Sequence, residues 1–394
     1  MKKISNSYSQ RGAVSLFIVV FAALLITIVT VSFVRIMLQD QQQATTTDLS
    51  QSAYDSAQAG VEDAKRALLK YQDICNSGGD CVNAANKINS PTCNEAIGTL
   101  QGLQGVTLSN NEVKVQTGTD SSNQTALDQA YTCVKIALNT DDYLGTLKAN
   151  ESNIVPLSSM GSFNTVQIQW FSTKDASGTI NLQSDSKVPL LKQWGGLNNP
   201  RPPIIRAQFI QFSGSSGFTL GNFDSSIVDN GANTLFLYPS KVGLNSKSLS
   251  IDTPRKMPTG NPQSVKCLDS IGASVYSCFA KIGLPKLITG ADHTLFLHLS
   301  SLYNKTDYRI TLYDSASPAL TVPFNAVQPQ IDSTGRANDL FRRVQTRVEL
   351  TDVNFPYPEA AVDITGSFCK GFSVTDNSDD YNNGNVGQIT DCNP

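Results

Sequence analysis

The residues with the clearest catalytic potential are two histidines, and their surroundings do not complete a catalytic motif. Asp292 precedes His293, an acid–histidine pair of the kind found in hydrolase triads. However, the sequence has no G-x-S-x-G motif to supply the nucleophile. The glycines of the Ser/Gly-rich stretch 213–222 lack the Gly-Lys-Ser/Thr sequence of a phosphate-binding loop. We therefore expect the histidines to decorate a strand and the chain not to be an enzyme.

Eight cysteines form the second chemically capable set, and none is part of a C-x-x-C pair. With only two histidines in the chain, a zinc site is not expected. The N-terminal segment described below predicts that all eight lie outside the cytoplasm, where an even number of cysteines favours disulfides. We expect Cys369 to pair with Cys392 and Cys267 with Cys278. The remaining four could pair in other ways, and the weaker prediction is Cys93–Cys133 and Cys75–Cys81.

A cluster of arginines near the C-terminus suggests nucleic-acid binding, but it has a simpler explanation. Four arginines could hold nucleic-acid phosphates, but three acids interrupt them, so a solvated strand face is the better interpretation. The four are Arg336, Arg342, Arg343 and Arg347, and the acids are Asp332, Asp339 and Glu349.

The oxygen-rich stretch 376–385 resembles a calcium loop only in part. Asp380, Asn382 and Asp391 match positions 1, 3 and 12 of an EF-type loop, but Gly384 is one position early and Asp391 replaces the closing Glu. We expect a flexible loop, no metal and no cofactor.

The composition excludes some classes of protein. The chain has 394 residues, a net charge of -3, and only 16% charged residues. Average globular domains carry about 25% charged residues. A disordered chain driven by charge and a polybasic nucleic-acid binder are therefore both excluded, and the length allows two or three domains.

The N-terminus has the pattern of a membrane anchor. Residues 1–12 contain Lys2, Lys3 and Arg11 and no acid, and residues 13–34 contain no charge. Twenty-two helical residues span roughly 33 Å, enough to cross the hydrocarbon core. The basic flank predicts a cytoplasmic N-terminus. A cleaved signal peptide is the alternative, but its apolar region is usually about 7–15 residues and an A-x-A site would follow.

The apolar segment is predicted to continue as an amphipathic helix to about residue 72. The first proline is Pro91, and apolar residues recur at spacings of three and four from Leu49 to Tyr71. Gly60 is the weak position, because glycine in a helix costs about 1 kcal/mol relative to alanine. The outer part of this helix must pack on something, and we expect the C-terminal region to provide it.

The remaining chain is predicted to be β-rich, which gives an α+β fold with a mostly antiparallel head. Residues Ala126–Leu138 and Pro91–Leu100 are expected to form helical fragments, whereas stretches such as 166–170, 308–312 and 344–350 alternate with period two. The expected parts are a leader (1–12), a helix (13–72), a Cys-containing helical and irregular subdomain (73–150), a β-rich module (151–260), and a second β-rich module with a C-terminal disulfide loop (261–394).

The leader and helix resemble those of type IV pilins. Arg11-Gly12 precedes the apolar run directly, and the Ala-rich stretch 53–64 is similar to that of PilX-type minor pilins. The resemblance implies that a prepilin peptidase cuts between Gly12 and Ala13 and that the new terminus is methylated. Major pilins carry Glu at the fifth mature position, where this chain has Phe17. Its absence is similar to minor pilins and to the large tip pseudopilin of type II secretion. A Cys369–Cys392 loop would resemble the C-terminal disulfide loop of many pilins.

This resemblance implies a function in filament assembly. The partners would be other pilin subunits, prepilin peptidase, and an assembly platform with its ATPase. The protein would be located in the cytoplasmic membrane, with residues Ala13 to Val34 as the span, and in an extracellular pilus. The alternatives are a single-pass surface adhesin outside any filament, a tip pseudopilin of a type II secretion-like system, and an anchored hydrolase.

Overall fold

In the computed structural model of the chain, the described residues all belong to one compact unit, Met1–Leu350. They are residues 11–100, 106, 108–116, 129–176, 178–182, 194, 200–213, 231–244, 246–248, 263–271, 276–289, 293–314 and 320–350. The predicted α+β class is confirmed: a long N-terminal helix precedes a mostly antiparallel β-rich region.

Three helices open the described chain. Helix α1 (Arg11–Asn76) is 66 residues long and includes the whole predicted range 13–72. Helix α2 (Cys81–Ile88) begins where the Asp80 side chain accepts a hydrogen bond from the Asn83 N–H, a typical N-cap. The short helix α3 (Glu95–Gly98) replaces the longer fragment predicted over Pro91–Leu100.

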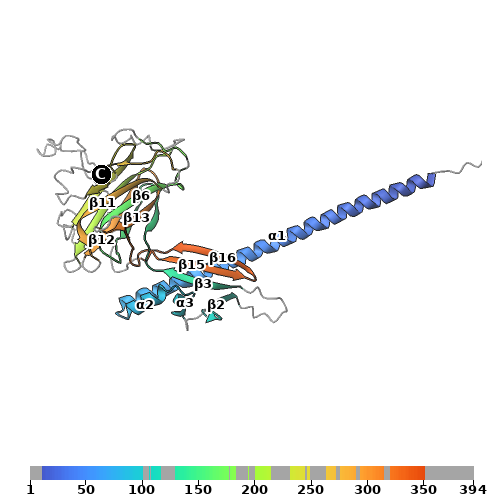
Figure 1. Ribbon diagram of the computed structural model, residues 1–394, viewed down its shortest axis with the longest axis horizontal. Coiled ribbons are helices and arrows are strands. Elements are labelled where there is room, and N and C mark those ends of the chain that lie inside the picture. The colour runs from blue at the N-terminus through green and yellow to red at the C-terminus, as the bar shows by residue number, and fades with distance from the viewer. Residues whose placement is uncertain are drawn as a thin grey trace, which may run out of the picture. The chain divides into compact units, whose positions relative to one another are not determined.

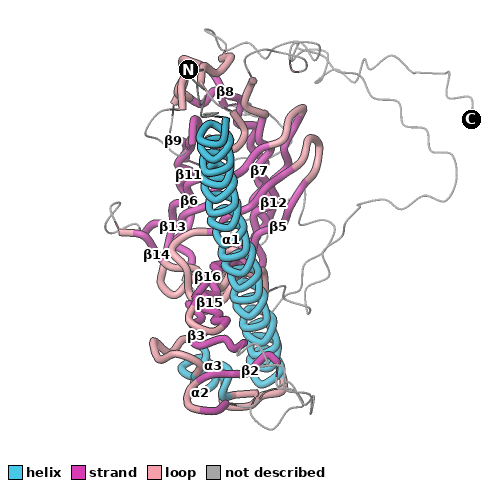
Figure 2. Tube along the Cα trace, turned by 90° about the vertical axis from the view of Figure 1, so that its right-hand side faces the viewer, coloured by secondary structure: helices cyan, strands magenta, loops and turns pink. Residues whose placement is uncertain are grey.

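The first sheet receives the outer part of α1. Its order is β1 (Leu108–Ser109), β2 (Glu112–Gln116), β3 (Gln129–Ala137), β15 (Gln330–Ala337) and β16 (Leu340–Arg347). Figures 1 and 2 show α1 running alongside β15 and β16, which it contacts together with β3. Helices α2 and α3 complete the same apolar core.

Two further sheets form the head. One has the order β10 (Gln263–Lys266), β8 (Gly231–Ser240), β7 (Ile204–Ser213), β12 (His293–Leu302) and β5 (Ser152–Pro156). The other has β14 (Thr321–Val322), β13 (Thr306–Tyr313), β6 (Phe163–Ser172), β11 (Tyr276–Ile288) and β9 (Ser246–Ser248), with β4 (Tyr143–Leu147) also paired to β13. Apolar residues of both sheets, such as Trp170 and Leu297, belong to one core.

Two predictions for this region are wrong. Residues 129–137 form strand β3, where a helical fragment over Ala126–Leu138 was predicted, because pairing with β2 and β15 outweighs local helix propensity. The proposed boundaries at 150 and 260 do not separate structural modules. Strand β3 pairs with β15, and both head sheets combine strands from either side of residue 260. Alternation along a strand predicts which face is buried but does not identify the partner strand.

Candidate functional site: the surface of helix α1

The inner part of α1 exposes a long apolar surface, in which Arg35 is the one charged residue. From Leu16 to Leu38 every side chain is exposed, including Phe17 at 76% and Val34 at 54%. By length and composition alone, this helix could cross a membrane. Twenty-three residues at about 1.5 Å each give roughly 34 Å, close to the thickness of a hydrocarbon core. The predicted cleavage residues Gly12 and Ala13 lie in the first turn of α1.

A polar helical stretch follows the apolar one. Side chains from Gln39 to Asp48 are all exposed, and this stretch carries no basic residue. Its three consecutive threonines are satisfied within the helix, because their hydroxyls donate to backbone carbonyls four residues earlier, at 2.8–2.9 Å. Ten residues separate the apolar surface from the first packed turn by about 15 Å.

The outer part of α1 packs on the first sheet through very small side chains. Ala53, Ala57, Ala64 and Ala67 are fully buried, which confirms the face predicted from the period of three and four. A Cβ atom built on Gly335 of β15 would lie only 2.2 Å from the carbonyl oxygen of Ala53 and the amide nitrogen of Ala57. The helix and the strand are therefore in backbone contact.

Gly60, the weak position in the sequence, has a packing explanation. A Cβ atom there would lie 2.4 Å from Ser333 Oγ on β15 and 2.9 Å from a methyl group of Val134 on β3. Glycine thus lowers helix propensity by about 1 kcal/mol but permits this close approach.

One polar contact at this interface is partly buried. The Tyr131 hydroxyl on β3 donates to Asp63 Oδ2 at 2.7 Å, and Arg66 pairs with the other oxygen of Asp63 at 2.9 Å. Burial, with the Asp63 hydrogen bond and charge, raises the pKa of Tyr131, so the hydroxyl stays protonated as the donor. This contact orients the helix on the sheet.

Three disulfides hold the regions around the helix and head, and they match three predicted pairs. Cys75–Cys81 joins the end of α1 to α2, Cys93–Cys133 joins the α2–α3 connection to β3, and Cys267–Cys278 joins β10 to β11. The Cα atoms lie 4.7, 4.8 and 4.3 Å apart, near the range usual for disulfides. Cys369 and Cys392 lie outside the described residues.

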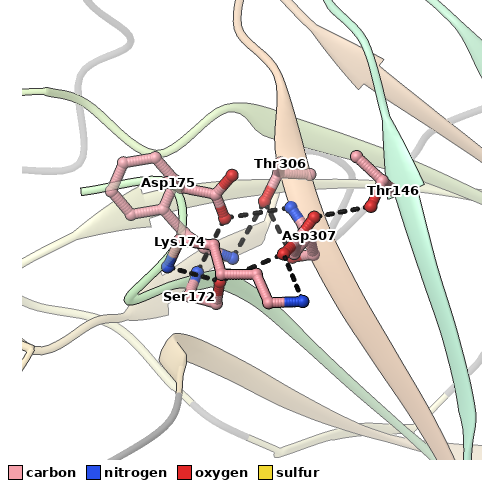
Figure 3. Close-up of polar contacts among 7 residues, drawn as sticks. Thr146, Ser172, Lys174, Asp175, Thr306 and Asp307 are labelled. Atoms are coloured by element: carbon pink, nitrogen blue, oxygen red, sulfur yellow. Dashed lines mark hydrogen bonds and ion pairs between the residues drawn. The ribbon is translucent and has the colours of Figure 1, made fainter. Parts of the chain in front are cut away.

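A polar cluster in the head contains two carboxylates at the join of β6 and β13 (Figure 3). Asp175 Oδ2 accepts hydrogen bonds from the backbone N–H groups of Ser172 and Asp307, at 2.8 and 2.9 Å. Asp307 accepts from Thr146 at 2.6 Å and pairs with Lys174 at 3.8 Å. Burial raises the pKa of Asp175. Asp175 Oδ2 and the Asp307 carboxylate already bind groups of the protein itself. The cluster therefore stabilises the turn after β6 and is not arranged to bind a substrate.

The other sequence candidates are dispersed. His293 and His298 both lie on β12, and His298 Nδ1 is 3.4 Å from the side-chain oxygen of Gln208. Asp292, the stretch 213–222 apart from its first residue, and the partial calcium loop lie outside the described residues. Within the described part of the chain, no three His, Cys, Asp or Glu residues gather as metal ligands.

The four arginines lie on β15 and β16 and have acceptors in the protein itself. Arg343 pairs with Asp332, Arg347 with Asp142, Arg336 with Glu112, and Arg342 Nε donates to Ser50 Oγ. This arrangement fits the strand-face interpretation better than a phosphate grip.

Sequence reasoning missed two groups of residues. Asp142 forms ion pairs with both Arg309 and Arg347, at 2.8 and 2.7 Å. Arg201 lies buried beside Trp194. Neither has a local sequence signature, because their partners are distant in the chain.

No family model, curated protein or solved structure matches this chain.

Proposed function

We propose that the protein is a minor pilin or pilin-like subunit, anchored in a membrane by α1 and carrying a β-rich head. The observation that carries the proposal is the division of one unbroken helix into an exposed apolar part, Leu16–Leu38, and an outer part buried on a sheet from Ala53 onward. A helix that is apolar on all sides suits lipid or a bundle of similar helices.

The polar stretch 39–48 supports the membrane part of the proposal. Its length of about 15 Å suits the headgroup region, so the first helix–sheet contacts would begin beyond the hydrocarbon. Phe17 would project from the apolar surface, where major pilins offer a carboxylate to a neighbour. The subunit would therefore be scarce in a filament or placed near its tip.

The decisive experiment is N-terminal sequencing of the exported protein. The proposal expects a start at Ala13, with the mass of residues 1–12 lost. Gly12→Leu should block this cleavage, whereas Ser9→Leu, the same bulky side chain three residues upstream, should leave it intact. Recovery of intact Met1, or of a start beyond Val34, would contradict the pilin proposal.

A second measurement separates a filament subunit from a membrane-anchored adhesin. Sheared filaments should contain the protein at a level well below that of a smaller pilin with Glu at its fifth mature position. If the protein is the dominant filament subunit, the argument from Phe17 is wrong. If it stays entirely in the membrane fraction, the adhesin alternative is favoured.

A further inference from the structure

Arg201, in the segment just before β7, is a buried cation whose donors are largely unused. Its side chain is only 5% exposed, and Nη2 donates to the side-chain oxygen of Asn181 at 3.1 Å. Among the described residues, the Nε and Nη1 atoms are buried without a hydrogen-bond partner, and burial lowers the pKa of the guanidinium. A buried charge without a counter-ion is strongly unfavourable, so a group of this kind requires an explanation, such as an absent anion.

One aromatic ring, that of Trp194, stands beside this guanidinium, and the ring of Tyr303 stands beside Trp194. Its central carbon lies 5.5 Å from the centroid of the Trp194 ring, and the Trp194 and Tyr303 centroids are 5.0 Å apart. Trp194 packs with Ile204 and Tyr238, so it lies on the sheet formed by β7 and β8. Together the rings and the guanidinium combine apolar surface with a charged donor, the usual composition of a ligand site.

Tyr303 is held in place at a cost. Its φ is +75°, a left-handed conformation that is strained for a bulky residue, and Tyr303 remains 41% exposed. Its backbone N–H donates to Asn150 Oδ1 at 3.1 Å. The next residue, Asn304, donates from Nδ2 to the carbonyl oxygen of Arg201 at 2.8 Å. The turn between β12 and β13 is therefore tied directly to the arginine.

The neighbouring sheet supplies no internal anion. Strands β5, β7, β8, β10 and β12 contain no Asp or Glu. They contain Arg206, whose Nε is also buried without a hydrogen-bond partner, and His298, whose pKa is lowered by burial and by the Arg206 charge. Lys305, in the adjoining turn, is exposed, and its charge acts on the Asp175 carboxylate.

We propose that Arg201, Trp194 and Tyr303 bind the carboxylate of an acidic sugar, such as a uronic acid unit of a surface glycan. The planar guanidinium donates to the carboxylate, an interaction for which arginine is especially suited. The half-exposed Tyr303 ring covers the apolar face of the sugar. A single-stranded nucleic acid fits less well, because its repeated phosphates require a positively charged groove and this chain has a net charge of -3.

The burial of Arg201 has a kinetic consequence. Since the guanidinium is 5% exposed without ligand, the carboxylate reaches it only after a local rearrangement. Association should therefore be slow compared with that of a preformed open site.

The test is calorimetric titration of the full-length chain in detergent with trigalacturonic acid. Neutral galactotriose, inorganic phosphate and a single-stranded DNA 12-mer are the comparison probes. We expect trigalacturonate to bind at least tenfold more tightly than galactotriose. Arg201→Leu should remove this preference, and Arg201→Lys should weaken it because lysine lacks the planar fork. Arg342→Leu is the matched control and should bind as the unmodified chain does.

Thermal unfolding of the same variants distinguishes a binding role from a structural one. A guanidinium kept for a ligand is unfavourable without it, so Arg201→Leu should melt at the same temperature or higher. A midpoint lowered by several degrees would overturn the proposal, as would equal binding of the two sugars or unchanged binding by Arg201→Leu. Arg201-dependent binding of phosphate alone or of DNA, without the sugar, would also overturn the acidic-sugar assignment. These outcomes are independent of filament assembly, because the protein is studied in detergent.

Discussion

Adding one methyl group at Gly335 should separate α1 from the first sheet. In Gly335→Ala the new Cβ would lie 2.2 Å from both Ala53 O and Ala57 N. Carbon contacts normally settle near 3.5–4.0 Å, so the helix must move away by about 1 Å or more. These two atoms are four residues apart along the helix, where the backbone hydrogen bond of an α-helix forms, so neither can yield alone.

The magnitude follows from the rigidity of both surfaces. Overpacking of a core costs typically 1–3 kcal/mol, and a clash with helix backbone should reach about 3 kcal/mol. A loss of this size lowers the unfolding midpoint of a domain of 150–250 residues by roughly 6–12 °C. The unit Met1–Leu350 is larger, so its midpoint should fall by somewhat less. Calorimetry in detergent measures the shift, and trypsin cleavage after Lys65 or Arg66 reports locally on release of the helix.

Two other glycines provide the comparison. Gly98→Ala in α3 meets nothing within 4 Å and should change stability by less than about 1 kcal/mol, because alanine is also the better helix former. Gly60→Ala meets the side chains of Ser333 and Val134, which can adjust, so its effect should be intermediate. If Gly335→Ala melts within 1 °C of the unmodified chain, the backbone-contact argument is refuted.

Four further predictions concern crosslinks and pH. Replacing Cys93 and Cys133 by serine, which opens a loop with a sequence separation of 40, should cost about 4 kcal/mol in the chain-entropy model, measured by denaturant unfolding. The Arg343 hydrogen bond lowers the pKa of Asp332, so Asp332→Asn should remove stability that is present at pH 7 and lost from the unmodified chain as pH falls below about 4. The pH dependence expected from Asp175 has the opposite sign, because burial raises the pKa of its carboxyl group. Relative to Asp175→Asn, the unmodified chain should lose stability as pH rises above about 4. Equal pH profiles of the two proteins would contradict this. Peptide mapping without reduction should find Cys369 bonded to Cys392, and free thiols there would show that the prediction is wrong.

Local patterns determined the features that depend on near neighbours in the chain. The long apolar helix, its amphipathic outer face and the alternating strands at Val166–Trp170 and Tyr308–Leu312 were all predictable, because side-chain period reflects which face is buried. The disulfides Cys75–Cys81 and Cys267–Cys278 were predictable because their cysteines are close in sequence, whereas Cys93–Cys133 has a sequence separation of 40.

The tertiary structure decided everything that depends on distant partners. It made residues 129–137 a strand by pairing them with β15, about two hundred residues away, where local propensity had predicted a helix. It explained Gly60, a weak point for the helix alone, as a position where helix and sheet approach closely. It also left Arg201 buried without a carboxylate among the described residues, a fact of long-range packing. The period of apolar residues in a helix or strand depends on which side chains are buried within that one segment. Which strands pair, where helix and sheet come into close contact, and which charges pair depend on how segments distant in sequence pack together.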